Sequence, residues 1–314
     1  MRRRHSINKL EANFSLIVIT FFSSLQYIFL SGVPDGIPNS AFVCITSFIG
    51  FVLLFLVFYN ELFRLDKSHI IQCLILSLQL FVFNYFLLMG SSSLDAVTIS
   101  CVVSAYFVFI PIIEIIAFRI FPQKNKIISI IVVLTGILFI MNLEVHKLFD
   151  KSILFLLIAD IAMATYVVFT GYFTSRSNPS ILAMGQLLFI AIISFIAWNV
   201  EARITGIRIS LPSEPMFWGS VIFISVFIRG MYTVVQTYAQ RFVSALNTSM
   251  IFATEIIITM LTSPIVSEYF GISSEAVNIS VNMCIGAVLM VIGILIADPS
   301  VLDEFKLKKR VKNV

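Results

Sequence analysis

The sequence contains few charged residues: Asp, Glu, Lys and Arg make up 12% of its 314 positions, against about 25% in a soluble globular protein. It also contains no phosphate-binding glycine loop, nucleophile elbow or zinc-binding signature. Its four cysteines lie inside apolar runs without metal-ligand spacing, and its three histidines form no cluster. These absences argue against a soluble enzyme, and we expect no catalytic residues, no metal site and no cofactor.

Apolar residues take the place of charge. They make up 59% of the chain, 31 of them are Phe, and the mean hydropathy is +1.01. Ten apolar runs approach the ~20 residues that a helix needs to cross ~30 Å of hydrocarbon. The runs are 13–31, 40–59, 69–89, 96–120, 126–142, 152–174, 180–199, 215–239, 245–267 and 277–297. The sequence therefore predicts an all-α integral membrane protein with ten transmembrane helices.

The distribution of Lys and Arg predicts the orientation, because cytoplasmic loops are enriched in these residues. With the N-terminus inside, 16 of the 21 basic residues fall in cytoplasmic segments, namely Arg2, Arg3, Arg4, Lys9, Arg64, Lys67, Arg119, Lys124, Lys126, Arg176, Arg241, Lys306, Lys308, Lys309, Arg310 and Lys312. The outside segments hold only Lys147, Lys151, Arg203 and Arg208. We therefore predict a multi-pass protein of the plasma (cell inner) membrane with both termini cytoplasmic. The net charge of +4 reflects this topology rather than a nucleic-acid partner.

The two halves of the chain show a weak internal repeat. The fifth run ends in LTGILFI around Gly136, and the tenth ends in VIGILI around Gly293. The fourth and ninth runs each contain one Glu. Because each half has five spans, the second half must insert upside down, which is a transporter architecture with its binding site at the midplane. We divide the chain into a cytoplasmic N-terminus (1–12), a first five-helix repeat (13–142), a second (152–297) and a basic tail (298–314) that contacts anionic lipid.

Four ionisable side chains lie deep inside the apolar runs: Glu114, Asp160, Arg229 and Glu255. Each costs about 2.5–3.5 kcal/mol at a helix centre that faces lipid, so they should face protein or a wet cavity. Arg229 and Glu255 lie at matching depths, which leaves two alternatives: a structural salt bridge, or a site that meets a charged substrate. Glu114 could line the cavity or extend to the interface. Asp160 could line it or lie at a close helix contact.

Uncharged candidates accompany these charges. Arg229, Tyr232 and Gln236 recur at helical spacing and form one polar stripe on an apolar helix. The rings of Tyr106, Tyr166 and Tyr232 could stack on a flat or cationic solute, or simply pack between helices. The predicted substrate-binding residues are therefore Arg229, Glu255, Glu114, Tyr106, Tyr232, Gln236 and Asp160.

The ordered pattern resembles the EamA-type members of the drug/metabolite transporter superfamily. The segments that carry the likeness are VSAYFVFIP (103–111), VQTYAQRF (235–242) and NTSMIFATE (247–255). The resemblance implies ten helices in two inverted five-helix repeats that move small metabolites by alternating access. The chain departs from the family pattern at Ser23-Ser24, Thr46-Ser47 and Ile256, and Arg229 stands where small residues are usual. The substrate therefore does not follow from the resemblance.

We expect a carrier for an amino acid, an amine or a nucleoside-like metabolite, with protons as the candidate coupling ion. A flippase or exporter of a lipid-linked or amphipathic substrate is the alternative, and it requires an apolar opening towards the bilayer. A membrane scaffold or enzyme subunit is a minor alternative. The expected partners are a small-molecule substrate, protons and membrane lipid. Small-residue faces at Gly286 and Gly293 leave a monomer and a homodimer open.

Overall fold

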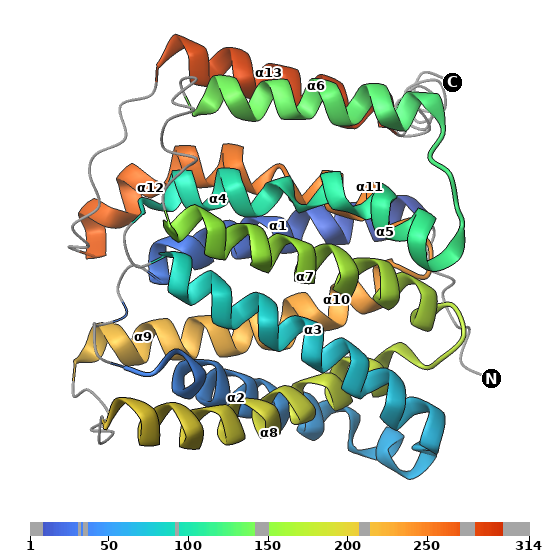
Figure 1. Ribbon diagram of the computed structural model, residues 1–314, viewed down its shortest axis with the longest axis vertical. Helices are drawn as coiled ribbons and strands as arrows, with labels where there is room; N and C mark the ends of the chain where they lie inside the picture. The colour runs from blue at the N-terminus through green and yellow to red at the C-terminus, as the bar shows by residue number, and fades with distance from the viewer. Residues whose placement is uncertain are drawn as a thin grey trace, which may run out of the picture.

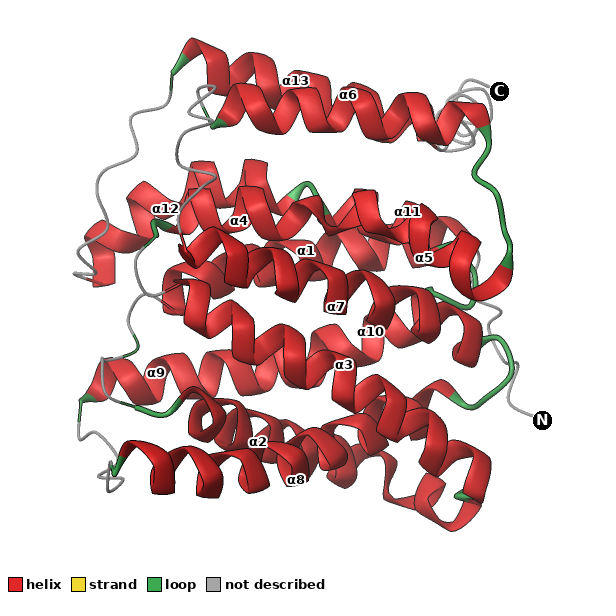
Figure 2. Ribbon diagram, in the orientation of Figure 1, coloured by secondary structure: helices red, strands yellow, loops and turns green. Residues whose placement is uncertain are grey.

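The computed structural model describes residues 9–30, 33, 37–91, 94–141, 151–206, 214–270 and 280–297. In this part of the chain all regular structure is helical, which confirms the predicted all-α class (Figure 2). Residues 1–8 of the predicted N-terminal segment and all of the basic tail lie outside the described residues. The helices run along one common direction, and consecutive spans are antiparallel (Figure 1).

The first half of the chain supplies five helical segments. They are α1 (Lys9–Leu30), α2 (Asn39–Phe58) with its extension η1 (Tyr59–Arg64), α3 (Lys67–Ser91), the interrupted segment α4 (Ala96–Ser104), η2 (Ala105–Val108) and α5 (Phe109–Phe118), and α6 (Lys124–Ile140). The second half supplies five more. They are α7 (Lys151–Thr174), α8 (Pro179–Thr205), the segment α9 (Pro215–Phe223), η4 (Ile224–Tyr232) and α10 (Thr233–Ala239), the segment α11 (Ala245–Phe252) and α12 (Glu255–Phe270), and α13 (Val281–Ala297).

Eight of the described helical segments are long and apolar enough to cross a membrane. They coincide with predicted runs one to four and six to nine, so the prediction of a multi-pass membrane protein is confirmed. The fifth and tenth runs form α6 and α13, which have 17 residues each and pack against one another (Figure 1). A tenfold crossing therefore stays a prediction for these two helices.

The outward faces of the helices are apolar, as contact with lipid requires. Large apolar side chains such as Phe14, Leu56, Ile116 and Ile265 are exposed on different spans. Exposed side chains of this kind would be unfavourable in water but match the hydrocarbon of a bilayer. Polar side chains are instead drawn to the helix interfaces, where Asp160, among others, is fully buried.

The two halves of the chain interleave rather than fold side by side. α2 packs along α8, α3 along α7, and α6 along α13, so each of these pairs joins the two halves. At the α6–α13 contact the backbones touch, because a Cβ built on Gly286 would lie 2.4 Å from the carbonyl oxygen of Gly136. Small residues at this crossing let the two helices approach without a cleft between them.

Basic residues of the described connections gather at one end of the bundle. The connections η1–α3, α5–α6, α7–α8 and α10–α11 all lie at that end, on the right in Figure 1. Arg64, Arg119, Arg176 and Arg241 lie in or beside them. At the same end Asp66 accepts the backbone N–H of His69 at 2.8 Å at the start of α3, which lowers the pKa of that carboxyl.

Candidate functional site

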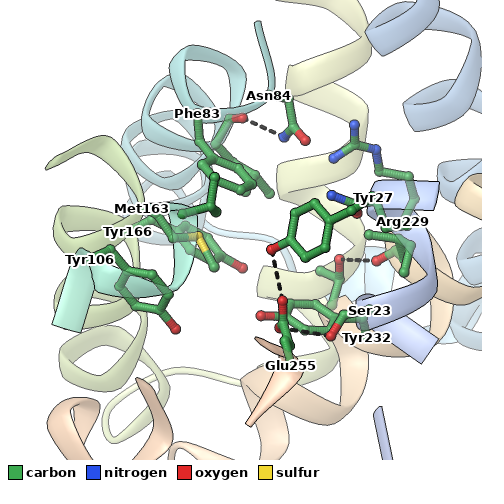
Figure 3. Close-up of a pocket in the computed structure, with 15 residues that line it drawn as sticks. Ser23, Tyr27, Phe83, Asn84, Tyr106, Met163, Tyr166, Arg229, Tyr232 and Glu255 are labelled. Carbon is green, nitrogen blue, oxygen red and sulfur yellow. Dashed lines mark hydrogen bonds between the residues drawn. The ribbon is translucent and has the colours of Figure 1, made fainter. Parts of the chain in front are cut away.

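A cavity lies between helices of both halves, near the middle of the spans (Figure 3). Its empty volume is about 540 Å³, which includes space open to solvent. The polar side chains around it come from α1, α3, η2, α7, η4, α10 and α12: Ser23, Gln26, Tyr27, Asn84, Tyr106, Tyr166, Arg229, Tyr232, Thr233 and Glu255. The rest of the wall is apolar and contains Leu80, Phe83, Val103, Met163 and Ile228.

Two helical spans break where they reach the cavity. In the first half, the 3₁₀ turn Ala105–Val108 precedes Pro111, which has no N–H to offer the carbonyl of Phe107. In the second half, the chain leaves the helical path at residues 253–254, between α11 and α12. The first break holds Tyr106 and the second directly precedes Glu255. Both breaks fall in the fourth span of their half, so the two interrupted helices meet the cavity from equivalent positions in the chain.

Glu255 lies at the start of α12 and is held by helix α1. The hydroxyl of Ser23 donates to Oε1 at 2.7 Å, and the hydroxyl of Tyr27 donates to Oε2 at 2.7 Å (Figure 3). The helix N-terminus adds a favourable dipole for a carboxylate. The side chain is only 6% exposed. Each oxygen keeps lone pairs for a further donor, since a carboxylate offers about four acceptor sites.

Arg229 is placed by an unusual helix segment. It lies in the nine-residue π-helical stretch η4, a conformation that is rare and frequent at functional sites. The side chain is 5% exposed, its Nε has no hydrogen-bond partner, and within the described part of the chain its guanidinium forms no ion pair. Figure 3 shows the guanidinium turned towards Asn84, away from Glu255. The structure therefore does not show the Arg229–Glu255 salt bridge that was one of the two alternatives.

The surroundings of Arg229 are polar but uncharged. Gln26 and Asn84 flank it and also line a smaller adjoining cavity that Arg229 reaches. The amide of Asn84 donates to the carbonyl of Leu80 one turn earlier, which orients its side chain. No Asp or Glu side chain lines that smaller cavity. The described site thus has a basic end around Arg229 and an acidic end at Glu255. This basic end of the site is a different place from the end of the bundle where the basic connections gather.

Tyrosine rings form the wall between these ends. Tyr27, Tyr106, Tyr166 and Tyr232 all line the cavity, and the ring of Tyr232 stacks on Phe252 at 4.9 Å between centroids. The hydroxyl of Tyr106 is buried without a hydrogen-bond partner among the described residues. Rings fixed in this way present flat faces and one unused hydroxyl to whatever occupies the cavity.

The predicted site residues divide into two groups. Arg229, Glu255, Tyr106 and Tyr232 line the cavity. Glu114, Gln236 and Asp160 do not. Gln236 is buried on α10 with both amide atoms unpartnered, and Glu114 is half-buried on α5. Asp160 is fully buried on α7, and neither carboxyl oxygen has a hydrogen-bond partner in the part of the chain that the structure describes.

Sequence reasoning missed five polar lining residues, Ser23, Gln26, Tyr27, Asn84 and Thr233. All are uncharged side chains inside apolar runs, and such residues are common on helix–helix interfaces of membrane proteins. Gln26 and Asn84 carried a readable signal, because an amide in the membrane interior needs a partner. Among the described residues, no group of three or more His, Cys, Asp and Glu side chains could hold a metal ion.

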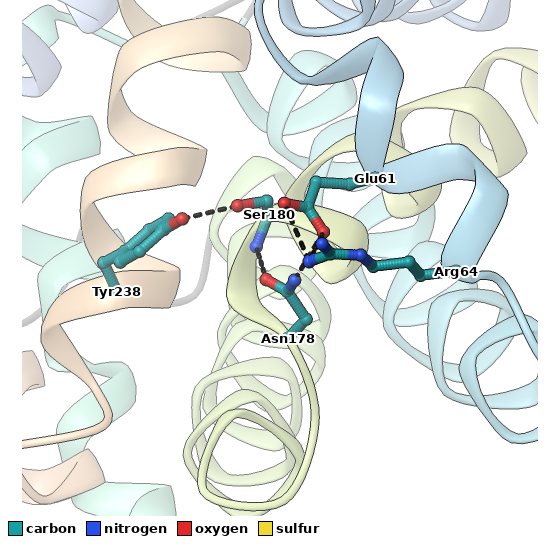
Figure 4. Close-up of polar contacts among 5 residues, drawn as sticks. All are labelled: Glu61, Arg64, Asn178, Ser180 and Tyr238. Carbon is teal, nitrogen blue, oxygen red and sulfur yellow. Dashed lines mark hydrogen bonds and ion pairs between the residues drawn. The ribbon is translucent and has the colours of Figure 1, made fainter. Parts of the chain in front are cut away.

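A second set of polar contacts joins helices at the basic end of the bundle (Figure 4). The amide of Asn178 donates to Glu61 at 2.8 Å, and Glu61 also pairs with Arg64 at 3.2 Å. The hydroxyls of Ser180 and Tyr238 share a hydrogen bond. The first contacts stay within the α2–α8 pair, whereas the Ser180–Tyr238 bond ties that pair to α10.

The chain is similar to known proteins in part of its sequence and in its fold. Residues 10–142 match the family model of the EamA-like transporter family, which lies in the drug/metabolite transporter superfamily. A solved crystal structure is similar over 91% of this chain and 95% of its own, with a TM-score of 0.62 and 14% sequence identity. At that identity the likeness shows a shared fold only. The comparison with curated proteins gives no match.

Proposed function

We propose that this chain, whose residues 10–142 match the EamA-like transporter family, is a secondary transporter of a small organic metabolite. The observation that carries the proposal is the central polar cavity, which holds the opposite charges of Arg229 and Glu255 and is lined by interrupted helices from both halves. Broken helices at corresponding places in two halves are the usual surroundings of a transporter binding site. The proposed substrates are an amino acid, an amine or a nucleoside-like metabolite.

The packing pattern supports an inverted repeat of five helices in each half. The second spans of the two halves, α2 and α8, pack together, and so do the fifth spans, α6 and α13. The third span of the first half, α3, packs against the first span of the second half, α7. Equivalently, the third span of the second half, which contains η4 and α10, packs against the first span of the first half, α1. Exchanging the halves therefore reproduces the main contacts, as a pseudo-two-fold axis in the membrane plane requires.

The proposed mechanism is alternating access, which this arrangement of helices supports. In the proposed orientation, the basic end of the bundle faces the cytoplasm of a cell whose plasma membrane holds the protein, and both termini lie on that side. In that orientation, the Ser180–Tyr238 bond holds α8 and α10 together at the cytoplasmic end. Breaking it would let α10 move relative to the α2–α8 pair and open the cavity to that side, as rocking of one helix bundle against another requires.

Proton coupling is part of the proposal, and two carboxyl groups could serve it. A charged carboxylate without partners is costly inside a membrane, so Asp160, whose oxygens have no hydrogen-bond partner among the described residues, suits the neutral form. Glu255 has two hydroxyl donors and lies at the cavity. A proton that moves between solvent and one of these groups would couple the gradient to the substrate.

The lining argues against the amphipathic-substrate alternative. A flippase site needs an apolar opening to the bilayer, whereas this cavity presents a guanidinium, a carboxylate, two amides and four phenol groups. Burying lipid tails against these groups would leave them without partners. A small polar molecule, carried by a monomer or a homodimer, fits them better.

Purified protein in liposomes tests the proposal. Liposomes loaded with a mixture of amino acids, amines and nucleosides are placed under a pH gradient, and the solutes that cross are identified by mass spectrometry. We expect one class to move, and Glu255→Gln to slow it at least tenfold while the exposed Arg64→Gln does not. If no solute moves faster than in protein-free liposomes, the transporter proposal is wrong.

A further inference from the structure

The guanidinium of Arg229 is a buried cation that lacks a counter-charge in the described structure. It is 5% exposed, its Nε is unpartnered, and no described carboxylate lies within ion-pair distance of it. Leaving a charged group unpaired in the membrane interior is costly, and such residues usually mark a substrate pathway. The position therefore calls for an anion that comes from outside the chain.

None of the three acidic residues inside the apolar runs is positioned to neutralise Arg229. Glu255 is held by Ser23 and Tyr27 at the other end of the cavity, and Figure 3 shows the guanidinium facing Asn84 instead. Asp160 and Glu114 do not line the cavity at all. In the part of the chain that the structure describes, Gln26 and Asn84 line both cavities that Arg229 reaches, and neither carries charge.

The geometry of the Arg229 guanidinium favours a carboxylate as its ligand. A guanidinium presents parallel N–H donors that match the two oxygens of a carboxylate. The acidic end offers free lone pairs on Glu255 to an ammonium group. The tyrosine rings between the ends favour a cation and a flat or apolar body. One molecule that carries both charges would satisfy both ends and enter with no net charge.

We infer that the cavity binds an amino-carboxylate, with its carboxylate on Arg229 and its amino group facing Glu255. This inference rests on the proposed transporter function and narrows it from three metabolite classes to zwitterions. Arg229 is then the specificity-determining residue, because amines and nucleosides carry no anionic group that would neutralise its charge. Its place in the π-helical stretch fixes the guanidinium at the basic end.

Matched ligand series test the inference with intact purified protein. The probes are alanine, leucine and phenylalanine, the amines obtained by removing their carboxylate, and the acids obtained by removing their amino group. Affinities come from the rise of the unfolding temperature with ligand concentration, and transport from counterflow in liposomes. The variants are Arg229→Gln and Glu255→Gln, with Arg64→Gln as the matched control, since Arg64 forms an exposed ion pair far from the cavity.

We expect at least one amino acid to bind the wild type more tightly than both of its single-charge analogues. Arg229→Gln should weaken the amino acid and the acid by about 10- to 100-fold and leave the amine unchanged, because a hydrogen-bonded charge pair contributes that much. Glu255→Gln should weaken the amino acid and the amine, and leave the acid unchanged. Arg64→Gln should alter none of the three affinities.

Contrary results would distinguish an error in the amino-carboxylate inference from an error in the transporter proposal. Equal loss of all three ligands in Arg229→Gln, or an amine that binds as tightly as its amino acid, overturns the inference and leaves the transporter intact. The same holds if chloride alone stabilises the wild type as much as the amino acids do. If neither these probes nor the broader solute mixture moves in liposomes, the proposed function fails together with the inference that rests on it.

Discussion

Replacing Gly50 by Ala should displace Arg229 without touching any charged group. Gly50 lies in α2 opposite η4, and a Cβ built on it would lie 2.5 Å from the Cβ of Arg229. Carbon atoms in good contact are about 3.5–4.0 Å apart, so the two backbones must separate by roughly 1–1.5 Å. The clash involves atoms next to the backbone on both sides, and side-chain rotation does not relieve it.

The expected cost follows from this geometry. Forcing one extra carbon into a packed interface typically costs about 1–3 kcal/mol of unfolding free energy. A shift of ~1 Å also exceeds the tolerance of a bidentate hydrogen bond, so transport should fall by about tenfold or more. Unfolding temperature in detergent and initial transport rate in liposomes measure the two effects separately.

Gly219→Ala is the matched control. Gly219 is an exposed helical glycine, and a Cβ built on it would have no neighbour within 4 Å. This substitution should be neutral or stabilising by up to ~1 kcal/mol, because Ala favours a helix over Gly. In an Arg229→Gly background, Gly50→Ala should cost no more than the control, since the clashing Cβ is gone. A cost that persists in that background would refute the steric reasoning.

Three further substitutions test the site and its closure. Tyr27→Phe removes one of the two donors to Glu255 and should cost about 1.5–3 kcal/mol of unfolding free energy, measured by denaturation in detergent; an unchanged stability contradicts the contact. Asp160→Asn should leave substrate binding intact but make uptake insensitive to an imposed pH gradient; gradient-driven uptake at the wild-type rate would assign the proton to another group. Tyr238→Phe removes the bond to Ser180, and labelling of a cysteine placed at the cavity should become faster from the end of the bundle where this bond lies; equal labelling rates would show that the bond does not hold that end closed.

The charged ends of the site were readable from the sequence because charge inside an apolar run is costly. Arg229 and Glu255 stand out for this reason, and both line the cavity. Their depth along the helix axis follows from counting residues. The direction in which each side chain points around the helix axis does not follow from such counting. The π-helical stretch has more residues per turn than an α-helix, and it turns Arg229 out of α-helical phase. Matching depths therefore left a salt bridge between them open, and the described residues do not contain that salt bridge.

The uncharged part of the site could not be derived in the same way. Ser23 and Tyr27 reach Glu255 from positions more than 220 residues earlier in the chain, and nothing local marks them as partners. The first break, at Ala105–Val108, has a signal in the sequence, because Pro111 removes a backbone donor. The break before Glu255 has no such signal, since Ile256 follows it. Long-range packing decides that break.

The spans show the same division between local and long-range control. Eight apolar runs formed helices long enough to cross a membrane, because hydrophobic length is a local property. The fifth and tenth runs formed the 17-residue helices α6 and α13, whose principal contact is with each other. Gly136 and Gly293, which marked the internal repeat, both lie in this contact. The repeat signal thus located an interface between the halves.

An unpaired guanidinium in the cavity also has a consequence for the empty protein. Arg229→Met keeps an unbranched apolar stem and removes a buried charge that costs about 2.5–3.5 kcal/mol in a membrane interior. The variant should therefore unfold at a higher temperature than the wild type when no ligand is present, whereas Arg64→Met, at an exposed ion pair, should not. Adding the transported amino-carboxylate should reverse the order, because only the wild type gains the charge pair. If Arg229→Met is the less stable protein in both conditions, Arg229 has an internal partner and its charge is structural.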